Sequence, residues 1–259
     1  MSRYRFFYLV KIQFLGFRYS GWQKQPGQKT LEGMLSKTLK FVLPDQEIKI
    51  LGASRTDAKV SALAYVFELF VTEPIANLTS FQELLNSNLP SDIRVTQITT
   101  VDRTFNIIQS PKLKEYVYLF SFGEKNHPFC APFMANILVP LDIGAMKTAA
   151  RCFEGTHDFK AYTARIRPGT KSIRTITKCY LERNTLFTAN FFPTQSYLLH
   201  IISEGFMRYQ VRMIMGALMQ VGKGELSIAD IRESLKKEYS KTLTYVAPGS
   251  GLHLKTLKL

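Results

Sequence analysis

Apolar and polar residues alternate near the start of the chain. In residues 4–14 the apolar or aromatic positions are Tyr4, Phe6, Tyr8, Val10, Ile12 and Phe14. A period of two is typical of a strand with one buried face. We therefore expect a strand over residues 4–14.

The next segment changes to a helical period. Thr30 suits the N-cap position of a helix. The apolar residues that recur along one face of that helix are Leu31, Met34, Leu35, Leu39 and Val42. Residues 48–53 and 62–71 are typical of strands, so residues 55–61 should connect two strands.

Ser80, with Glu83 three residues later, predicts a capping box for a short helix through Leu84 and Leu85. Residues 92–101 return to a strand pattern. The first hundred residues therefore have the predicted order β-α-β-β-α-β.

A similar order follows in the second part of the chain. It begins with a strand over residues 115–122, continues with a helix from Asp142 to the C-cap candidate Gly155, and ends with a helix that Ser227 and Asp230 open. The other predicted elements are strands at 172–182, 186–192 and 197–204 and a helix at 208–222.

This order predicts an α+β fold. Two pseudo-symmetric split β-α-β halves, of the ferredoxin or RRM-like kind, would form one largely antiparallel mixed sheet with the helices on the opposite face. We expect the halves to be residues 1–107 and 108–259.

The charge balance favours a polyanionic partner. Against 20 acidic residues stand 34 Lys and Arg, a net charge of +14, and phosphates attract such a protein from a distance. The alternative is a basic protein without such a partner.

Other features narrow the chemistry and the setting. Cys130, Cys152 and Cys179 are far apart and form no disulfide framework, which fits a reducing, cytoplasmic location. The start of the chain is too polar for a signal peptide, and no apolar run has the length of a membrane span. Without a Walker loop, a GxGxxG turn or histidines at ligand spacing, we expect neither a nucleotide cofactor nor a metal.

An acidic residue stands out in the connection "SRTDAKVSA". Side chains alternate in an extended segment, so Arg55 and Asp57 should project to the same side and could pair. A guanidinium partner would keep the carboxylate ionised and ready to act as nucleophile or base. The alternative is an ordinary turn in which Asp57 caps a backbone amide and Arg55 is solvated.

Aromatic and basic residues form three further candidate groups. Tyr116 lies in an alternating aromatic strand beside Lys112 and Lys114, and it is the candidate to stack on a base, although core packing is the alternative. Arg208 and Arg212 are one turn apart on an otherwise apolar helix and need an acidic or phosphate partner. The third group lies in a predicted loop that is suited to phosphate contacts; the alternative is a solvated loop. Its basic residues are Arg165, Arg167, Lys171, Arg174 and Lys178.

Taken together, these segments resemble the TruA type of tRNA pseudouridine synthase over nearly the whole chain. "YLVKIQFLGFRYSGWQKQ" resembles the opening strand and GWQxQ segment of the family, and "ASRTDAKVSALAYVFEL" its RTDAGVHA segment. Further resemblances, in order, are "NSNLPSDIRV", "KEYVY", "GTHDFKAYTA", "SIRTI", "GFMRYQVRMIMGALMQVG" and "APGSGLHL".

The resemblance implies isomerisation of uridine to pseudouridine in the anticodon stem-loop of tRNA, at positions 38 to 40, without a cofactor. Asp57 would then attack the nucleotide, Arg55 and Arg212 would orient it, and Tyr116 would stack on the target base. It also implies a homodimer with tRNA lying across both subunits. Lys59 and the basic loop would contact the RNA.

The chain departs from the family pattern at several positions. Lys59 replaces glycine, Ser61 replaces histidine, and Leu15 stands in the usual YDG of the first strand. Asn106 and Ile108 replace a histidine and an arginine. A paralogue with a different or narrower RNA target is therefore one alternative, and a catalytically silent RNA-binding module is another. The missing glycine-rich loop disfavours an RNA methyltransferase.

Overall fold

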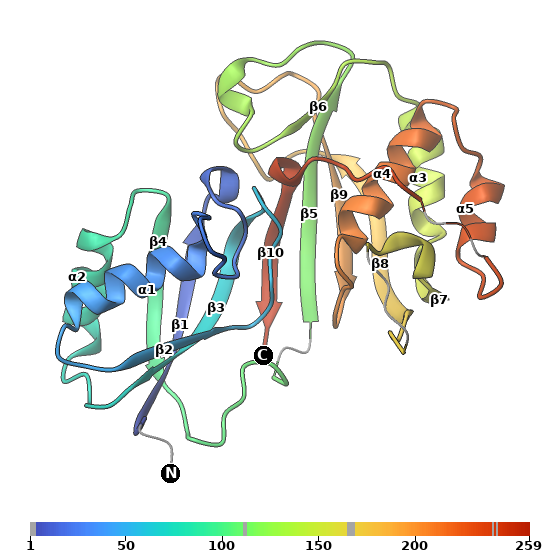
Figure 1. Ribbon diagram of the computed structural model, residues 1–259. Helices are drawn as coiled ribbons and strands as arrows, with labels where there is room; N and C mark the ends of the chain where they lie inside the picture. Colours follow the sequence, from blue (N-terminus) through green and yellow to red (C-terminus); the bar gives the residue numbers. More distant parts are fainter. Residues whose placement is uncertain (1–3, 111–112, 165–168, 240, 242) are drawn as a thin grey trace. The chain divides into compact units, whose positions relative to one another are not determined.

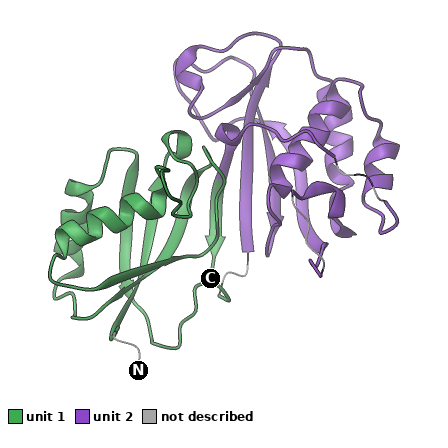
Figure 2. Cartoon of the chain, viewed as in Figure 1, with its two compact units in different colours: residues 1–112, 254–259 green, residues 113–253 purple. Residues whose placement is uncertain are grey.

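The structure is a computed structural model that describes the chain except for residues 1–3, 111–112, 165–168, 240 and 242. Arg165 and Arg167 of the predicted basic loop therefore lie outside the described residues. The chain divides into two compact units, shown in Figure 2. Unit 1 comprises Met1–Lys112 and Leu254–Leu259, and unit 2 comprises Leu113–His253.

Unit 1 is a sheet with two helices. Its elements are β1 (Phe6–Phe14), η1 (Gly16–Arg18), α1 (Leu31–Val42), β2 (Ile48–Gly52), β3 (Ser61–Val71), α2 (Leu78–Asn88) and β4 (Ile93–Thr100). β1 pairs antiparallel with both β3 and β4, and β2 pairs antiparallel with β3. The two helices pack against each other and against β2 and β4 (Figure 1).

The sequence pattern explains these elements. Alternate residues of β1 face the core, among them Val10 and Ile12, which are fully buried. The Thr30 hydroxyl accepts the N–H of Gly33 at 3.2 Å and caps α1 as predicted. Leu35 and Leu39 are buried on the inner face of α1. The predicted β-α-β-β-α-β order is confirmed for this part of the chain.

The described part of unit 2 contains further strands of the same ten-stranded sheet and three α-helices. Its elements are β5 (Leu113–Phe122), η2 (Pro128–Cys130), β6 (Ala135–Ile137), α3 (Ile143–Arg151), β7 (Gly155–Asp158), η3 (Lys160–Tyr162), β8 (Ile173–Arg183), β9 (Tyr197–Ser203), α4 (Gln210–Gly222), α5 (Ile228–Ser234) and η4 (Gly249–Gly251). The strand order is β5-β9-β8-β7, antiparallel throughout, and β6 pairs in parallel with β5. β10 (Leu252–Lys258) begins in unit 2 and ends in unit 1.

The predicted α+β class with mixed, mostly antiparallel pairing is confirmed. Ser227 and Asp230 open α5 as predicted, and they form a capping box in which each side chain accepts a backbone N–H of the other residue. No helix in the described part of the chain has the length and apolar character of a membrane span.

Two predicted helix ends are wrong. α2 begins at Leu78 because the side chain of Asn77 accepts the N–H of Ser80 at 3.0 Å, so Ser80 is not the cap. Asn is as good a cap as Ser, and the earlier cap adds a turn. α3 begins after Asp142 as predicted but ends at Arg151, and Gly155 instead opens β7.

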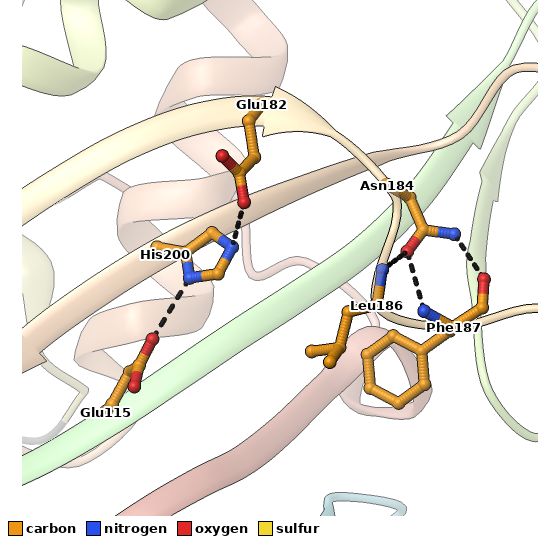
Figure 3. A network of polar contacts seen from close by, with 6 residues as sticks. All are labelled: Glu115, Glu182, Asn184, Leu186, Phe187 and His200. Carbon is orange, nitrogen blue, oxygen red and sulfur yellow. Dashed lines mark hydrogen bonds and ion pairs between the residues drawn. The ribbon is translucent and has the colours of Figure 1, made fainter.

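The predicted strand at 186–192 is also wrong. The Asn184 side chain accepts the N–H groups of Leu186 and Phe187 at 3.2 and 3.0 Å and bends the backbone into a turn (Figure 3). Phe187, Phe191 and Phe192 still pack on a buried apolar cluster. The apolar residues of this segment therefore indicate that it is packed against the core, although its backbone is irregular.

Candidate active site

Asp57 lies in the connection between β2 and β3, residues 53–60, which we call the Asp57 loop. Its side chain is half-buried, whereas Arg55 is exposed. The N–H of Val60 donates to the carbonyl of Asp57 at 3.3 Å and closes a turn after the acid. Pairing of Asp57 with Arg55 stays a prediction.

Residues 15–22, which we call the clamp segment, hold the Asp57 loop from one side. The N–H of Trp22 donates to the carbonyl of Thr56 at 3.1 Å, and the N–H of Lys59 donates to the carbonyl of Tyr19 at 3.0 Å. A Cβ on Gly21 would lie 2.4 Å from the Thr56 carbonyl oxygen, so only glycine permits this approach. The backbone on both sides of Asp57 is therefore fixed.

Lys59 has a backbone conformation that favours glycine. Its φ of 66° is in the left-handed region, which agrees with the glycine that the family resemblance places at this position. The N–H of Lys59 bonds to Tyr19, and its Nζ lies 5.3 Å from the centre of the Phe17 ring. The clamp segment thus compensates for a side chain at a glycine-like position.

Two hydroxyl groups beside Asp57 lack partners in the described part of the chain. The side-chain oxygens of Ser54 and Thr56 are buried without a hydrogen bond. Leaving a buried polar group unpaired costs roughly 1–3 kcal/mol. Sequence reasoning missed both residues, although they flank Arg55 in the quoted motif.

Arg212 in unit 2 is tied to the segment after α5. Its Nε donates to the carbonyl of Ala247 at 2.7 Å, and its own carbonyl accepts the Ala247 N–H at 3.1 Å. The guanidinium groups of Arg208 and Arg212 both lie about 5 Å from the Tyr209 ring, at 5.1 and 5.0 Å. Arg212 is half-buried and held by the protein, whereas Arg208 is exposed.

Tyr116 is more enclosed than its predicted stacking role suggests. It lies in β5 with 7% of its surface exposed, and its ring meets the edge of Phe206 at 5.4 Å. Burial also lowers the pKa of the neighbouring Lys114. The stacking role of Tyr116 stays a prediction.

The described end of the basic loop leads into β8. Lys171 is exposed, as a phosphate contact requires. Arg174 is half-buried and its guanidinium donates to the carbonyl of Ile173 at 2.8 Å. Of the predicted site residues, Arg55, Asp57 and Lys59 belong to unit 1, and Tyr116, Lys171, Arg174 and Arg212 belong to unit 2.

Unit 2 also contains a network of polar contacts that the sequence did not predict. His200 of β9 is 3% exposed and lies between two carboxylates (Figure 3). Its Nδ1 is 3.1 Å from Glu115 and its Nε2 is 3.0 Å from Glu182, although the second contact is not aligned as a hydrogen bond. Tyr180 stacks on the ring at 4.7 Å. The strand register brings these residues together.

Comparison with known proteins gives one consistent family. The sequence model of the family described as tRNA pseudouridine synthase matches residues 11–107 and 149–257. The tRNA pseudouridine synthase A of Thermodesulfovibrio yellowstonii is 33% identical over 254 residues, which cover 95% of this chain and 96% of the relative. That of Aquifex aeolicus is 31% identical over 256 residues, which cover 97% and 99%.

Proposed function

This chain belongs to the tRNA pseudouridine synthase family, whose members are isomerases, and from that premise we propose that it modifies uridines in the anticodon stem-loop, at positions 38 to 40, without a cofactor. The observation that carries this proposal is the half-buried Asp57, held on a fixed loop in the segment that matches the family.

The reaction is an isomerisation and needs no oxidant or reductant. The bond between N1 of uracil and the ribose breaks, the base turns, and a bond from C5 to the same ribose carbon forms. C5 then loses a proton and N1 gains one, so the atoms balance. We propose that Asp57 is the nucleophile, because a carboxylate can attack the nucleotide and leave again.

The other site residues would bind and orient the substrate. We propose that Arg55 and Arg212 orient the nucleotide and that Tyr116 stacks on the flipped base, which an enzyme must extract from its stack. Phosphate contacts would come from the basic residues Lys59, Arg165, Arg167, Lys171 and Arg174.

The same proposal covers the assembly and its setting. The N-terminal half would supply the acid, and the C-terminal half the tyrosine and the basic loop. The enzyme would act in the cytoplasm as a homodimer that binds tRNA across both subunits. The net charge of +14 supports the polyanionic partner.

Asp57→Asn tests the reaction. Asparagine is nearly isosteric but cannot act as the nucleophile, so we expect normal tRNA affinity and no pseudouridine in the product. Asp45→Asn is the matched control, because Asp45 is an exposed aspartate of the same unit. Activity of the Asp57 variant near the wild-type level would contradict the assigned role.

Mapping pseudouridines in tRNA from cells with and without the protein tests the target. Loss at positions 38 to 40 is the expected result. Loss at other uridines would instead favour a paralogue with a different target, which the departures Lys59 and Ser61 motivate. Unchanged tRNA, together with binding in vitro, would favour a silent RNA-binding module.

A further inference from the structure

We infer that Asp92, acting through Arg18 and Tyr19, is a positioning residue for the Asp57 loop. This inference rests on the proposed role of Asp57 as nucleophile. Asp92 lies just before β4 and, in this assignment, acts through the clamp segment without touching the substrate. Three lines of contact carry the inference.

The first is the grip of Asp92 on the clamp segment. Its Oδ2 accepts from Arg18 Nε at 2.6 Å, and its Oδ1 accepts from the Tyr19 hydroxyl at 2.8 Å. The backbone carbonyl of Asp92 accepts the N–H of Leu15 at 2.9 Å. One residue thus holds the clamp segment at three points, two of them on neighbouring residues.

The Asp92 carboxylate is suited to this task. Its side chain is 9% exposed, and burial alone would raise its pKa. The hydrogen bonds from Arg18 and Tyr19 outweigh burial and lower the pKa of Asp92 below its usual value. Asp92 is therefore ionised at neutral pH and accepts both bonds.

The second line is the grip of the clamp segment on the Asp57 loop. The Tyr19 carbonyl accepts the Lys59 N–H, and the Trp22 N–H donates to the Thr56 carbonyl. The N–H of Gly16 donates to the Ser61 hydroxyl at 2.9 Å. These bonds lie before and after Asp57 in the sequence, so the clamp segment fixes both arms of its loop.

The third line is the strained backbone of Lys59. A lysine at a φ of 66° persists only where its surroundings hold it. The Tyr19 carbonyl supplies one such contact. Tyr19 is itself 2% exposed and fixed at its hydroxyl by Asp92, so the position of its carbonyl depends on that bond.

Tyr19→Phe tests this inference, because it removes the hydroxyl and keeps the ring. We expect kcat for pseudouridine formation to fall by about tenfold or more, since small misplacements of a reacting group are costly. KM for tRNA should stay nearly unchanged. Hydrogen exchange at the Lys59 and Trp22 amides should become faster.

Tyr8→Phe is the matched control. Tyr8 is also a buried tyrosine of unit 1, 3% exposed, and its hydroxyl accepts the Ile75 N–H at 2.9 Å. Both variants lose one part-buried hydrogen bond and should lower Tm by similar amounts. Only Tyr19→Phe should change kcat and the exchange at Lys59. Equal effects of the two variants would overturn the inference.

Asp92→Asn provides a second test with a conservative side chain. It keeps an acceptor for Tyr19 but removes the charge that binds Arg18. We expect kcat to fall less in Asp92→Asn than in Asp92→Ala. The control Asp45→Asn should keep the wild-type kcat. The inference would be overturned if hydrogen exchange in the Asp57 loop became faster in Tyr19→Phe, Asp92→Asn and Asp92→Ala while kcat stayed at the wild-type value in all three. If the wild-type protein forms no pseudouridine, that result counts against the proposed function. Hydrogen exchange would still test whether Asp92 and the clamp segment hold the Asp57 loop.

Discussion

At the scale of single residues, His253 shows what burial does to an ionisable group. Its ring is 2% exposed, and its Nε2 lies 2.8 Å from the Phe133 carbonyl. Burial lowers the pKa of His253 to about 4, although the carbonyl opposes this shift. The ring is therefore neutral at pH 7 and donates from Nε2 to Phe133.

This burial predicts a loss of stability in mild acid. An exposed histidine has a pKa of about 6.5. Below that pH, His253 therefore binds a proton in the unfolded chain but stays neutral in the folded chain. The free energy of unfolding should fall as the pH drops from about 6.5 to about 4, by about 3 kcal/mol at most.

His253→Gln should flatten that dependence, measured by urea unfolding at several pH values, because glutamine can still donate to Phe133 but does not titrate. His127→Gln is the control, since His127 is exposed. If the free energy of unfolding depends on pH to the same extent in His253→Gln as in the wild type, His253 is not the group responsible.

At the scale of elements, the network around His200 links three adjacent strands. Glu115 comes from β5, His200 from β9 and Glu182 from β8. Glu182 is 48% exposed, so its contact contributes little. The Glu115 side chain is only 14% exposed, so its hydrogen bond from the His200 ring N–H contributes more to stability.

A double-mutant cycle measures this link. His200→Leu should lower the free energy of unfolding by roughly 1–3 kcal/mol, because Glu115 loses a donor in a mostly buried position. In a Glu115→Leu background the same change should cost less, and the difference is the coupling energy. Equal costs in both backgrounds would show that the two residues do not interact energetically.

Local signals explain which elements the sequence predicted. The period of β1, the Thr30 cap of α1 and the capping box of α5 act within a few residues, so they are readable in the sequence. The predicted strand at 186–192 was wrong because Asn184 and a distant apolar cluster decide its backbone. The short strands β6 and β7 have too few residues to show a period.

The candidate site divides in the same way. The sequence singled out Asp57 through its motif, but the clamp segment and Asp92 hold the loop through bonds between residues 34 to 77 positions apart, from Trp22–Thr56 to Leu15–Asp92. No local pattern encodes such contacts. Likewise, the positive φ of Lys59 gives a physical reason for the glycine that the family resemblance implies at this position.

At the scale of the whole molecule, the net charge of +14 predicts salt-dependent tRNA binding. Lys171→Glu should weaken binding and reduce the slope of log K against log salt by about one for a lost phosphate contact. Lys37→Glu, on the exposed face of α1, changes the net charge equally and is the control. Filter binding at several salt concentrations measures both slopes, and equal slopes would exclude a phosphate contact at Lys171.

The division of the chain also affects how the protein folds during its synthesis. Unit 1 combines Met1–Lys112 with Leu254–Leu259, so the ribosome makes all of unit 2 between its two parts. The early part emerges before β10, which neighbours β3 in the sheet, so the edge of β3 that β10 covers is open and can pair with other chains. Nascent chains of this protein should therefore expose that edge until β10 has been made.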